Sequence, residues 1–197
     1  MSEKIGDSIG FWTPENINKY EDAINQTLSF VRTIEEKIYK ESGNHIVRHM
    51  EYRLKSSDSI AEKIKRKGRS VNIANADKAI NDLAGVRVIC FDSRQVYMLA
   101  DEVRKGKQLN VIKEKDYILH PKENGYQSYH MILDVFGIRV ELQIRTILMD
   151  AWSSLETVLV YKKKDIPPKE IIEKIRKFSK WSKKMDHMVE EMLEMKG

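Results

Sequence analysis

Cysteine, proline and glycine are all scarce in this chain, and each shortage excludes a class of protein. The single cysteine, Cys90, has no partner within the chain, so a disulfide-stapled fold is excluded. Because Cys90 stands in the apolar run 88–91, we interpret it as a buried, unreactive thiol. Four prolines and nine scattered glycines among 197 residues exclude collagen, and an apolar fraction of 41% excludes low-complexity disorder.

Long apolar runs and a strong excess of one charge are also missing. No stretch approaches the roughly 20 apolar residues that span a bilayer, and residues 1–5 carry no apolar leader. We therefore expect a soluble, cytoplasmic protein with no membrane partner. The net charge is only +5 although 33% of the residues are charged, so any basic surface must be local. Such a surface suits anionic small molecules or nucleic acid, and composition alone does not separate the two.

The spacing of apolar residues predicts one α+β domain with a long helix at each end. The first helix is capped by Thr13, starts at Pro14 and stops at residues 42–44. Further helices are expected at 57–68, 93–106, from Thr146 and from Lys169, and strands at 52–55, 86–91, within 109–118, 129–135 and 139–145. The expected fold is a small mixed sheet flanked by helices. We divide it into a helical extension (1–44), a catalytic domain (45–165) and a C-terminal helix (166–197).

An apolar stripe runs along the last helix at spacings of three and four residues. Its members are Ile172, Ile175, Phe178, Trp181, Met185, Met188 and Met192. A domain of this size can hardly cover two long apolar helix faces, so the stripe predicts a subunit interface in a closed oligomer. The alternative is that the two terminal helices pack on each other within one monomer.

Polar residues of the types that bind phosphate recur through the middle of the chain. In the strand 139–145 the polar residues, including Glu141 and Gln143, share one face because strand side chains alternate. Taken alone, that face could be a solvated surface with Arg–Glu pairs. The candidate phosphate ligands are Arg53, Lys55, Lys63, Lys65, Arg66, Lys122, His130 and Arg145. Two carboxylates, Asp82 and Glu141, could hold a divalent cation, and arginine planes and the Tyr126 ring could stack on bases. Because the chain has no Walker loop and no GxGxxG motif, side chains must bind the phosphates. The residues thus predict a nucleotide or nucleic-acid site with a metal, and no more.

Three blocks in order carry a resemblance to a known family: residues 82–88 (DLAGVRV), 120–130 (HPKENGYQSYH) and 141–146 (ELQIRT). With 52–55 and 59–60, they resemble the synthetase domain of the RelA/SpoT family, the GTP pyrophosphokinases that make the alarmones ppGpp and pppGpp. The resemblance covers about residues 45–165 and implies a nucleotidyltransferase-like fold. No HD dipeptide of the family's hydrolase domain occurs, so the chain is similar to a single-domain small alarmone synthetase.

The resemblance implies transfer of pyrophosphate from ATP to the 3′-hydroxyl of GDP or GTP, with GMP as a further candidate acceptor. For ATP it implies Arg53 and Arg87 around adenine and Lys55, Ser59, Lys63 and Arg66 on the phosphates. For catalysis it implies Asp82 and Glu141 on Mg²⁺, with Glu141 also activating the 3′-hydroxyl. For the acceptor it implies Tyr126 stacked on guanine, Asp150 accepting from the guanine N–H groups, and Lys122, Asn124, His130, Gln143 and Arg145 as further ligands. It also implies a homotetramer, with an alarmone or RNA as a regulator.

Two departures from the family pattern leave the acceptor open. Thr157 stands where many relatives have His, and Asp150 replaces the Asn of one branch. Some relatives pyrophosphorylate tRNA or adenosine nucleotides and act as toxins, but the modest net charge and Asp150 favour a guanine nucleotide. A non-enzymatic RNA-binding module is the other alternative, which leaves Asp82 and Glu141 unexplained because carboxylates repel phosphate.

Overall fold

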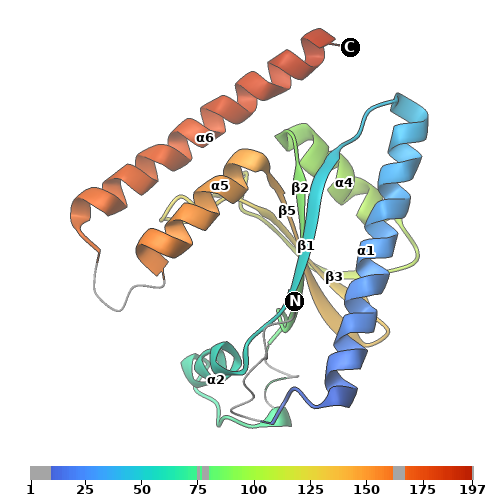
Figure 1. Ribbon diagram of the computed structural model, residues 1–197, viewed down its shortest axis with the longest axis vertical. Coiled ribbons are helices and arrows are strands. Elements are labelled where there is room, and N and C mark those ends of the chain that lie inside the picture. Colours follow the sequence, from blue (N-terminus) through green and yellow to red (C-terminus); the bar gives the residue numbers. More distant parts are fainter. Residues whose placement is uncertain (1–9, 75, 77–79, 162–166, 197) are drawn as a thin grey trace.

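Five strands form one mixed sheet in the computed structural model, which describes residues 10–74, 76, 80–161 and 167–196 (Figure 1). The strands are β1 (Val47–Leu54), β2 (Ala84–Cys90), β3 (Asn110–Asp116), β4 (Tyr129–Val135) and β5 (Ile138–Thr146). Their order across the sheet is β1-β2-β5-β4-β3. Only β2 and β5 pair in parallel, and the other neighbours are antiparallel. The predicted α+β fold with a small mixed sheet is therefore confirmed.

The helices begin and end close to where the sequence predicts. They are α1 (Pro14–Ser42), α2 (Ser57–Arg66), α4 (Ser93–Lys105), α5 (Ile147–Glu156) and α6 (Lys169–Lys196), with a π-helical turn η1 (Thr157–Tyr161) after α5. The Thr13 hydroxyl caps α1 by accepting from the Asn16 amide, and Gly43 ends it with φ of 71°, which glycine adopts without strain. None of the helices in the described part of the chain combines the length and hydropathy that crossing a bilayer requires.

One face of the sheet is buried under α1 and α4, which lie together on one side of it in Figure 1. The buried residues of α1, from Tyr20 to Ile38, belong to the same core as the inward side chains of β2, β4 and β5. The predicted division after residue 44 thus falls between α1 and β1, two elements that share this core. Cys90 is in the core as predicted, and burial raises the pKa of its thiol.

Strand β1 begins at Val47, earlier than the predicted stretch 52–55. It lies at the edge of the sheet, and most of its side chains are exposed. Such a strand shows no alternation of apolar and polar residues, so its first half left no pattern to find. Residues 1–5, considered for a leader, and the predicted boundary at residue 165 lie outside the described residues.

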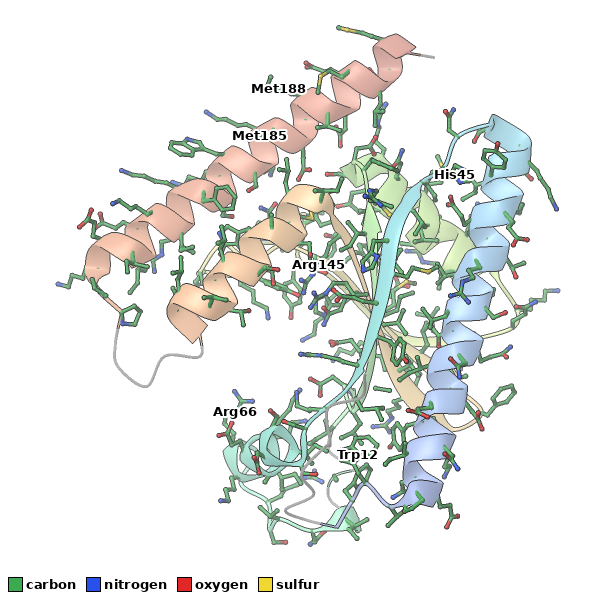
Figure 2. All side chains as sticks on the ribbon, in the orientation of Figure 1. Trp12, His45, Arg66, Arg145, Met185 and Met188 are labelled. Atoms are coloured by element: carbon green, nitrogen blue, oxygen red, sulfur yellow. The ribbon has the colours of Figure 1, made fainter. Side chains whose placement is uncertain are left out.

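Helix α6 docks through polar residues together with Ile175, and the later part of its apolar stripe, from Trp181 onward, faces outward. Ser179, Ser182 and Asp186 are buried on the docked face together with Ile175. Trp181 keeps 59% of its surface exposed, and Met185 and Met188 keep 48% and 58%. Figure 2 shows both methionines on the side of α6 that faces away from the sheet, while α1 lies across the sheet from α6. The alternative in which the two terminal helices cover each other is therefore wrong for this stripe.

Asp186 makes the docking of α6 sensitive to pH. Its Oδ2 accepts from the Thr146 hydroxyl at 3.0 Å, and its Oδ1 has no hydrogen-bond partner among the described residues. Burial raises the pKa of Asp186 to about 7; the Thr146 hydrogen bond opposes this shift, and the charges of Glu190 and Asp92 add to it. Because this pKa exceeds the ordinary value of 3.8, the folded protein binds the extra proton between about pH 4 and 7, and its stability falls as the pH rises through that window.

We therefore expect Asp186→Asn to stabilise the fold at pH 8 but not at pH 4. The amide keeps an acceptor for Thr146 and removes the buried charge, so the gain at pH 8 is on the order of 2–4 kcal/mol. Urea unfolding at both pH values measures it. An equal effect at pH 4 and pH 8 would show that the charge of Asp186 is not the cause.

Candidate active site

The face of the sheet opposite α1 and α4 forms the floor of a cleft with a volume of about 910 Å³. Alternation along β5 sends Glu141, Gln143 and Arg145 into this cleft, while the residues between them are buried in the core. Helix α2 and the ends of β1 and β2 form one wall, and the 122–126 loop and α5 form the other. Figure 2 shows Arg145 in the space between α5 and the sheet.

Asp82 sits on the first wall between two lysines. Lys55 Nζ donates to one of its oxygens at 3.1 Å and Lys63 Nζ to the other at 2.8 Å. Burial alone would raise the pKa of Asp82, but the hydrogen bonds and charges of the lysines outweigh burial and lower it. The carboxylate is thus ionised at neutral pH. It neutralises two cations of a type that also binds phosphate oxygens.

Arg53 and Arg87 lie on neighbouring strands of the same wall. The two side chains line a small hollow beside Gly85, which pairs with Arg53 across the β1–β2 ladder. Arg87 is held by Glu51 at 2.6 Å and by Asp150 at 3.1 Å. This placement fits the predicted arginine pair around a planar base.

Glu141 lies on the floor, where both of its oxygens are engaged. His130 Nδ1 donates to Oε1 at 3.0 Å, and Gln143 Nε2 donates to Oε2 at 2.7 Å. Burial alone would raise the pKa of Glu141, but the His130 and Gln143 hydrogen bonds outweigh it and lower the pKa, while the nearby charge of Asp82 opposes them. Glu141 is therefore a second ionised carboxylate in the cleft, positioned by its neighbours on β4 and β5.

Tyr126, on the second wall, is held through its hydroxyl as well as its ring. Arg145 Nη2 donates to the hydroxyl at 2.6 Å, and the hydroxyl lies 2.8 Å from His130 Nε2. Because Glu141 can only accept, His130 donates to it through Nδ1, and its other ring nitrogen shares a hydrogen bond with the Tyr126 hydroxyl. Lys122 Nζ lies 4.6 Å from the ring centroid, a cation–π contact that an incoming base would replace.

The loop that carries Tyr126 is a tight turn. The Gly125 amide donates to the Lys122 carbonyl at 2.8 Å, and the Lys122 amide donates to the Tyr126 carbonyl at 3.1 Å. Gly125 has φ of 96°, a conformation that other residues rarely adopt. The Asn124 side chain accepts from the Tyr126 amide at 3.1 Å and donates to Glu156 at 3.1 Å. Asn124 and Gly125 thus shape the loop.

The cleft brings together all but three of the site residues that the sequence predicts, and Lys65, one of the candidate phosphate ligands, is one of the three. Ser59 lies outside the lining, at the start of α2, where its amide donates to the Ser56 cap. Asp150 also lies outside the lining and bonds Arg87 at 3.1 Å and Arg145 at 3.2 Å. From α5, its carboxylate therefore bonds one arginine of the first wall and one of the floor.

Sequence reasoning missed several residues that line the cleft: Lys67, Asn81, Lys113, Lys115, Tyr117, Ser153, Ser154 and Glu156. The Tyr117 ring lies 4.6 Å from Lys122 Nζ, so the lysine contacts both this ring and that of Tyr126. The alternation of Lys113 and Lys115 in an otherwise weak strand was the available signal. Glu156 is the only cleft carboxylate within the described residues that contacts Asn124 by a hydrogen bond.

The donor set fits a cation that arrives with phosphate. Asp82 and Glu141 face one cleft, yet no group of three or more His, Cys, Asp or Glu side chains in the described residues could hold a metal alone. Mg²⁺ is commonly bound by one or two carboxylates together with substrate phosphates. The two carboxylates thus suit Mg²⁺ bound jointly with a nucleotide.

Two ionised carboxylates, one on a wall and one on the floor of a cleft that is rich in lysine and arginine, define a protein built to bind polyphosphate nucleotides. The family model described as "Region found in RelA / SpoT proteins" matches residues 52–166. The chain belongs to this RelA/SpoT family.

Named relatives and solved structures agree with that membership. The chain is 35% identical to GTP pyrophosphokinase YwaC of Bacillus subtilis over 162 residues, which cover 78% of this chain and 76% of the relative. It is 31% identical to GTP pyrophosphokinase YjbM of the same organism over 153 residues, covering 74% and 70%. The crystal structure of small alarmone synthetase 1 from Bacillus subtilis bound to its product pppGpp matches with a TM-score of 0.77 at 26% identity, covering 90% of this chain and 93% of that one.

Proposed function

We propose that the protein is a GTP pyrophosphokinase that transfers pyrophosphate from ATP to the 3′-hydroxyl of GDP or GTP and releases AMP. The products are the alarmones ppGpp and pppGpp, and the enzyme acts in the cytoplasm in the stringent response. The observation that carries the proposal is the placement of Asp82 and Glu141, both ionised, in one cleft between two cationic walls. The family membership indicates which group is transferred and which nucleotide accepts it.

ATP binds on the wall built from β1, β2 and α2. Arg53 and Arg87 hold adenine between their guanidinium planes. Lys55 and Lys63 leave Asp82 for the phosphate oxygens, with Arg66 beside them on α2. Ser59 does not line the cleft, so its part in ATP binding is indirect: it helps to form the first turn of α2.

Asp82 and Glu141 are the residues that would hold Mg²⁺ when it binds with the nucleotide. When bound, the ion neutralises charge that develops on the transferring phosphates. Glu141 accepts a hydrogen bond from the 3′-hydroxyl of the acceptor and orients its oxygen toward the β-phosphorus. A bond forms from that oxygen to the β-phosphorus. The bond between the β-phosphorus and the oxygen that bridges it to the α-phosphorus breaks, and AMP leaves with that bridging oxygen. Because the pKa of Glu141 is low, the carboxylate takes the proton late rather than removing it first.

The guanine nucleotide binds on the opposite wall. Tyr126 stacks on guanine, while Lys122, His130, Gln143 and Arg145 hold the ribose and phosphates. The carboxylates near the base are Asp150, between Arg87 and Arg145, and Glu156, on Asn124. A carboxylate can accept from the N1 and N2 hydrogens of guanine, which adenine does not offer in this arrangement.

One assay tests the reaction and its acceptor. Labelled ATP with Mg²⁺ is incubated with GDP, GTP, GMP, ADP or deacylated tRNA, and the products are separated by chromatography. We expect label in ppGpp or pppGpp and formation of AMP. Label transferred only to tRNA or to adenine nucleotides would assign the toxin activities, and RNA binding without any transfer would assign a binding module.

Tyr126→Ala should raise the acceptor KM roughly 5- to 150-fold and change the ATP KM little, because a lost stacking platform costs about 1–3 kcal/mol. If only the ring mattered, as the sequence alone suggests, Tyr126→Phe would change the acceptor KM little. In the structure Phe would leave Arg145 and His130 without the hydroxyl that they share, so we expect this variant to raise the acceptor KM as well. Initial rates with each substrate varied measure both variants. An unchanged acceptor KM in the alanine variant would make Tyr126 a packing residue of the loop.

We also propose that the enzyme is a homotetramer that α6 helps to assemble through its exposed apolar stripe. An aromatic and several methionines that are half-exposed along one helix are typical of a subunit interface. An alarmone or RNA that binds between subunits is the candidate regulator.

A further inference from the structure

Helix α6 contacts the 122–126 loop, called the acceptor loop below, through Ser179. The Ser179 hydroxyl donates to the Gly125 carbonyl at 2.6 Å and accepts from Gln127 Nε2 at 3.3 Å. Ser179 is only 6% exposed. A Cβ placed on Gly125 would lie 2.8 Å from both Cβ and Oγ of Ser179, so the loop backbone rests directly against this serine.

This contact fixes the peptide that carries Tyr126. The Gly125 carbonyl and the Tyr126 amide belong to one planar peptide unit, so fixing one end orients the other. Ser179 binds the carbonyl, and the Asn124 side chain binds the amide at 3.1 Å. Gly125 at φ of 96° has a wide choice of conformations, so the hydrogen bond from Ser179 adds a restraint from outside the loop to those within it.

The same helix is anchored on either side of the contact. Trp152 Nε1 donates to the Ile175 carbonyl at 2.8 Å, and the Thr146 hydroxyl donates to Asp186 at 3.0 Å. Trp152 and Thr146 belong to α5 and its cap, which form part of the acceptor wall. The position of Ser179 is therefore set by the element that also bounds the site.

We propose that Ser179 is a positioning residue for the acceptor nucleotide: it holds the Gly125–Tyr126 peptide and so makes acceptor binding depend on the docking of α6. The proposal rests on the proposed function only in taking the 122–126 loop as the acceptor loop. It assigns to α6 a part in the site of its own subunit, separate from any part in assembly.

The test compares Ser179→Ala with Ser182→Ala. Ser182 is also buried on the docked face, but its hydroxyl donates to the Phe178 carbonyl within α6 at 3.0 Å. Loss of one buried hydrogen bond should raise the acceptor KM of Ser179→Ala roughly 3- to 20-fold. The ATP KM of Ser179→Ala should stay within about twofold of wild type. So should the ATP KM and the acceptor KM of Ser182→Ala. Thermal unfolding of both variants shows whether a change in stability accompanies the effect.

Hydrogen exchange over residues 120–127 gives a readout that needs no activity. Ser179→Ala should exchange faster there than wild type and Ser182→Ala, even if the wild type transferred no pyrophosphate and the proposed function failed. Unchanged exchange in this segment, or an active wild type with an unchanged acceptor KM in Ser179→Ala, would overturn the proposal. Equal rises in both KM values with a lowered unfolding temperature would also overturn it, because Ser179 would then serve folding alone.

Discussion

Glu141→Gln is expected to lower kcat for pyrophosphate transfer by about 10²-fold or more, while the Kd for ATP stays within about twofold of wild type. The amide has the size of the carboxylate and keeps one acceptor oxygen for its neighbours. It removes the negative charge that orients the 3′-hydroxyl and takes its proton. Because the lowered pKa keeps Glu141 ionised at neutral pH, the variant loses a charge that the native site always carries there.

ATP binding should be intact because neither hydrogen bond of Glu141 goes to the wall built from β1, β2 and α2, where ATP is proposed to bind. Its two hydrogen-bond partners, His130 and Gln143, lie on β4 and β5, whereas Lys55 and Lys63 are held by Asp82. Binding of a non-hydrolysable ATP analogue by calorimetry, beside initial rates with GDP, separates the two effects.

Glu102→Gln is the matched control for this variant. Glu102 lies on α4 and pairs with Lys37 and Lys105 at the surface, away from the cleft. It should leave kcat unchanged. A Glu141→Gln enzyme that kept most of the wild-type rate would remove Glu141 from the chemical step and leave it as a structural partner of His130.

The cleft floor could be predicted from sequence because strand alternation is a local property. Residues 139–145 alternate between polar and apolar, and β5 places the polar members on the cleft floor. The contacts among these side chains are not local. That Asp82 holds two lysines, or that Asp150 bonds Arg87 of β2 and Arg145 of β5, depends on how the strands, α2 and α5 meet, and no spacing in the sequence encodes it.

The two terminal helices illustrate the same limit. Both carry an apolar stripe with helical spacing, which indicates only that each face is covered by something. The stripe of α1 is covered by the sheet of its own chain, whereas that of α6 is fully buried only at Ile175 and is exposed from Trp181 onward. In α6 the face that docks is the polar one, with Ser179, Ser182 and Asp186 buried. Hydrophobic periodicity could not find that face, because most of its buried residues are polar and are held by hydrogen bonds.

The outward stripe leads to the second large expected effect: Trp181→Glu should dissociate the oligomer. Charge along α6 is unevenly distributed. Its first part carries Lys169, Lys174, Arg176, Lys177, Lys180, Lys183 and Lys184 against Glu170 and Glu173, and its last part carries Glu190, Glu191 and Glu194 against Lys196. Two copies of α6 packed antiparallel would place the basic part of each beside the acidic part of the other, with the apolar stripes between them.

Trp181 is the largest side chain of this stripe and is 59% exposed in the single chain. Loss of a buried interface tryptophan commonly costs about 2 kcal/mol or more, and a glutamate in its place adds a charge that must lose its water. We therefore expect light scattering at micromolar concentration to give a wild-type mass of four times the 23.1 kDa chain, and a monomer or dimer for the variant. Phe136→Glu is the control, because Phe136 is an 83% exposed aromatic at the β4–β5 turn, outside α6. A wild-type mass near 23.1 kDa would refute the oligomer. An undiminished mass in Trp181→Glu would place the subunit contact on another surface.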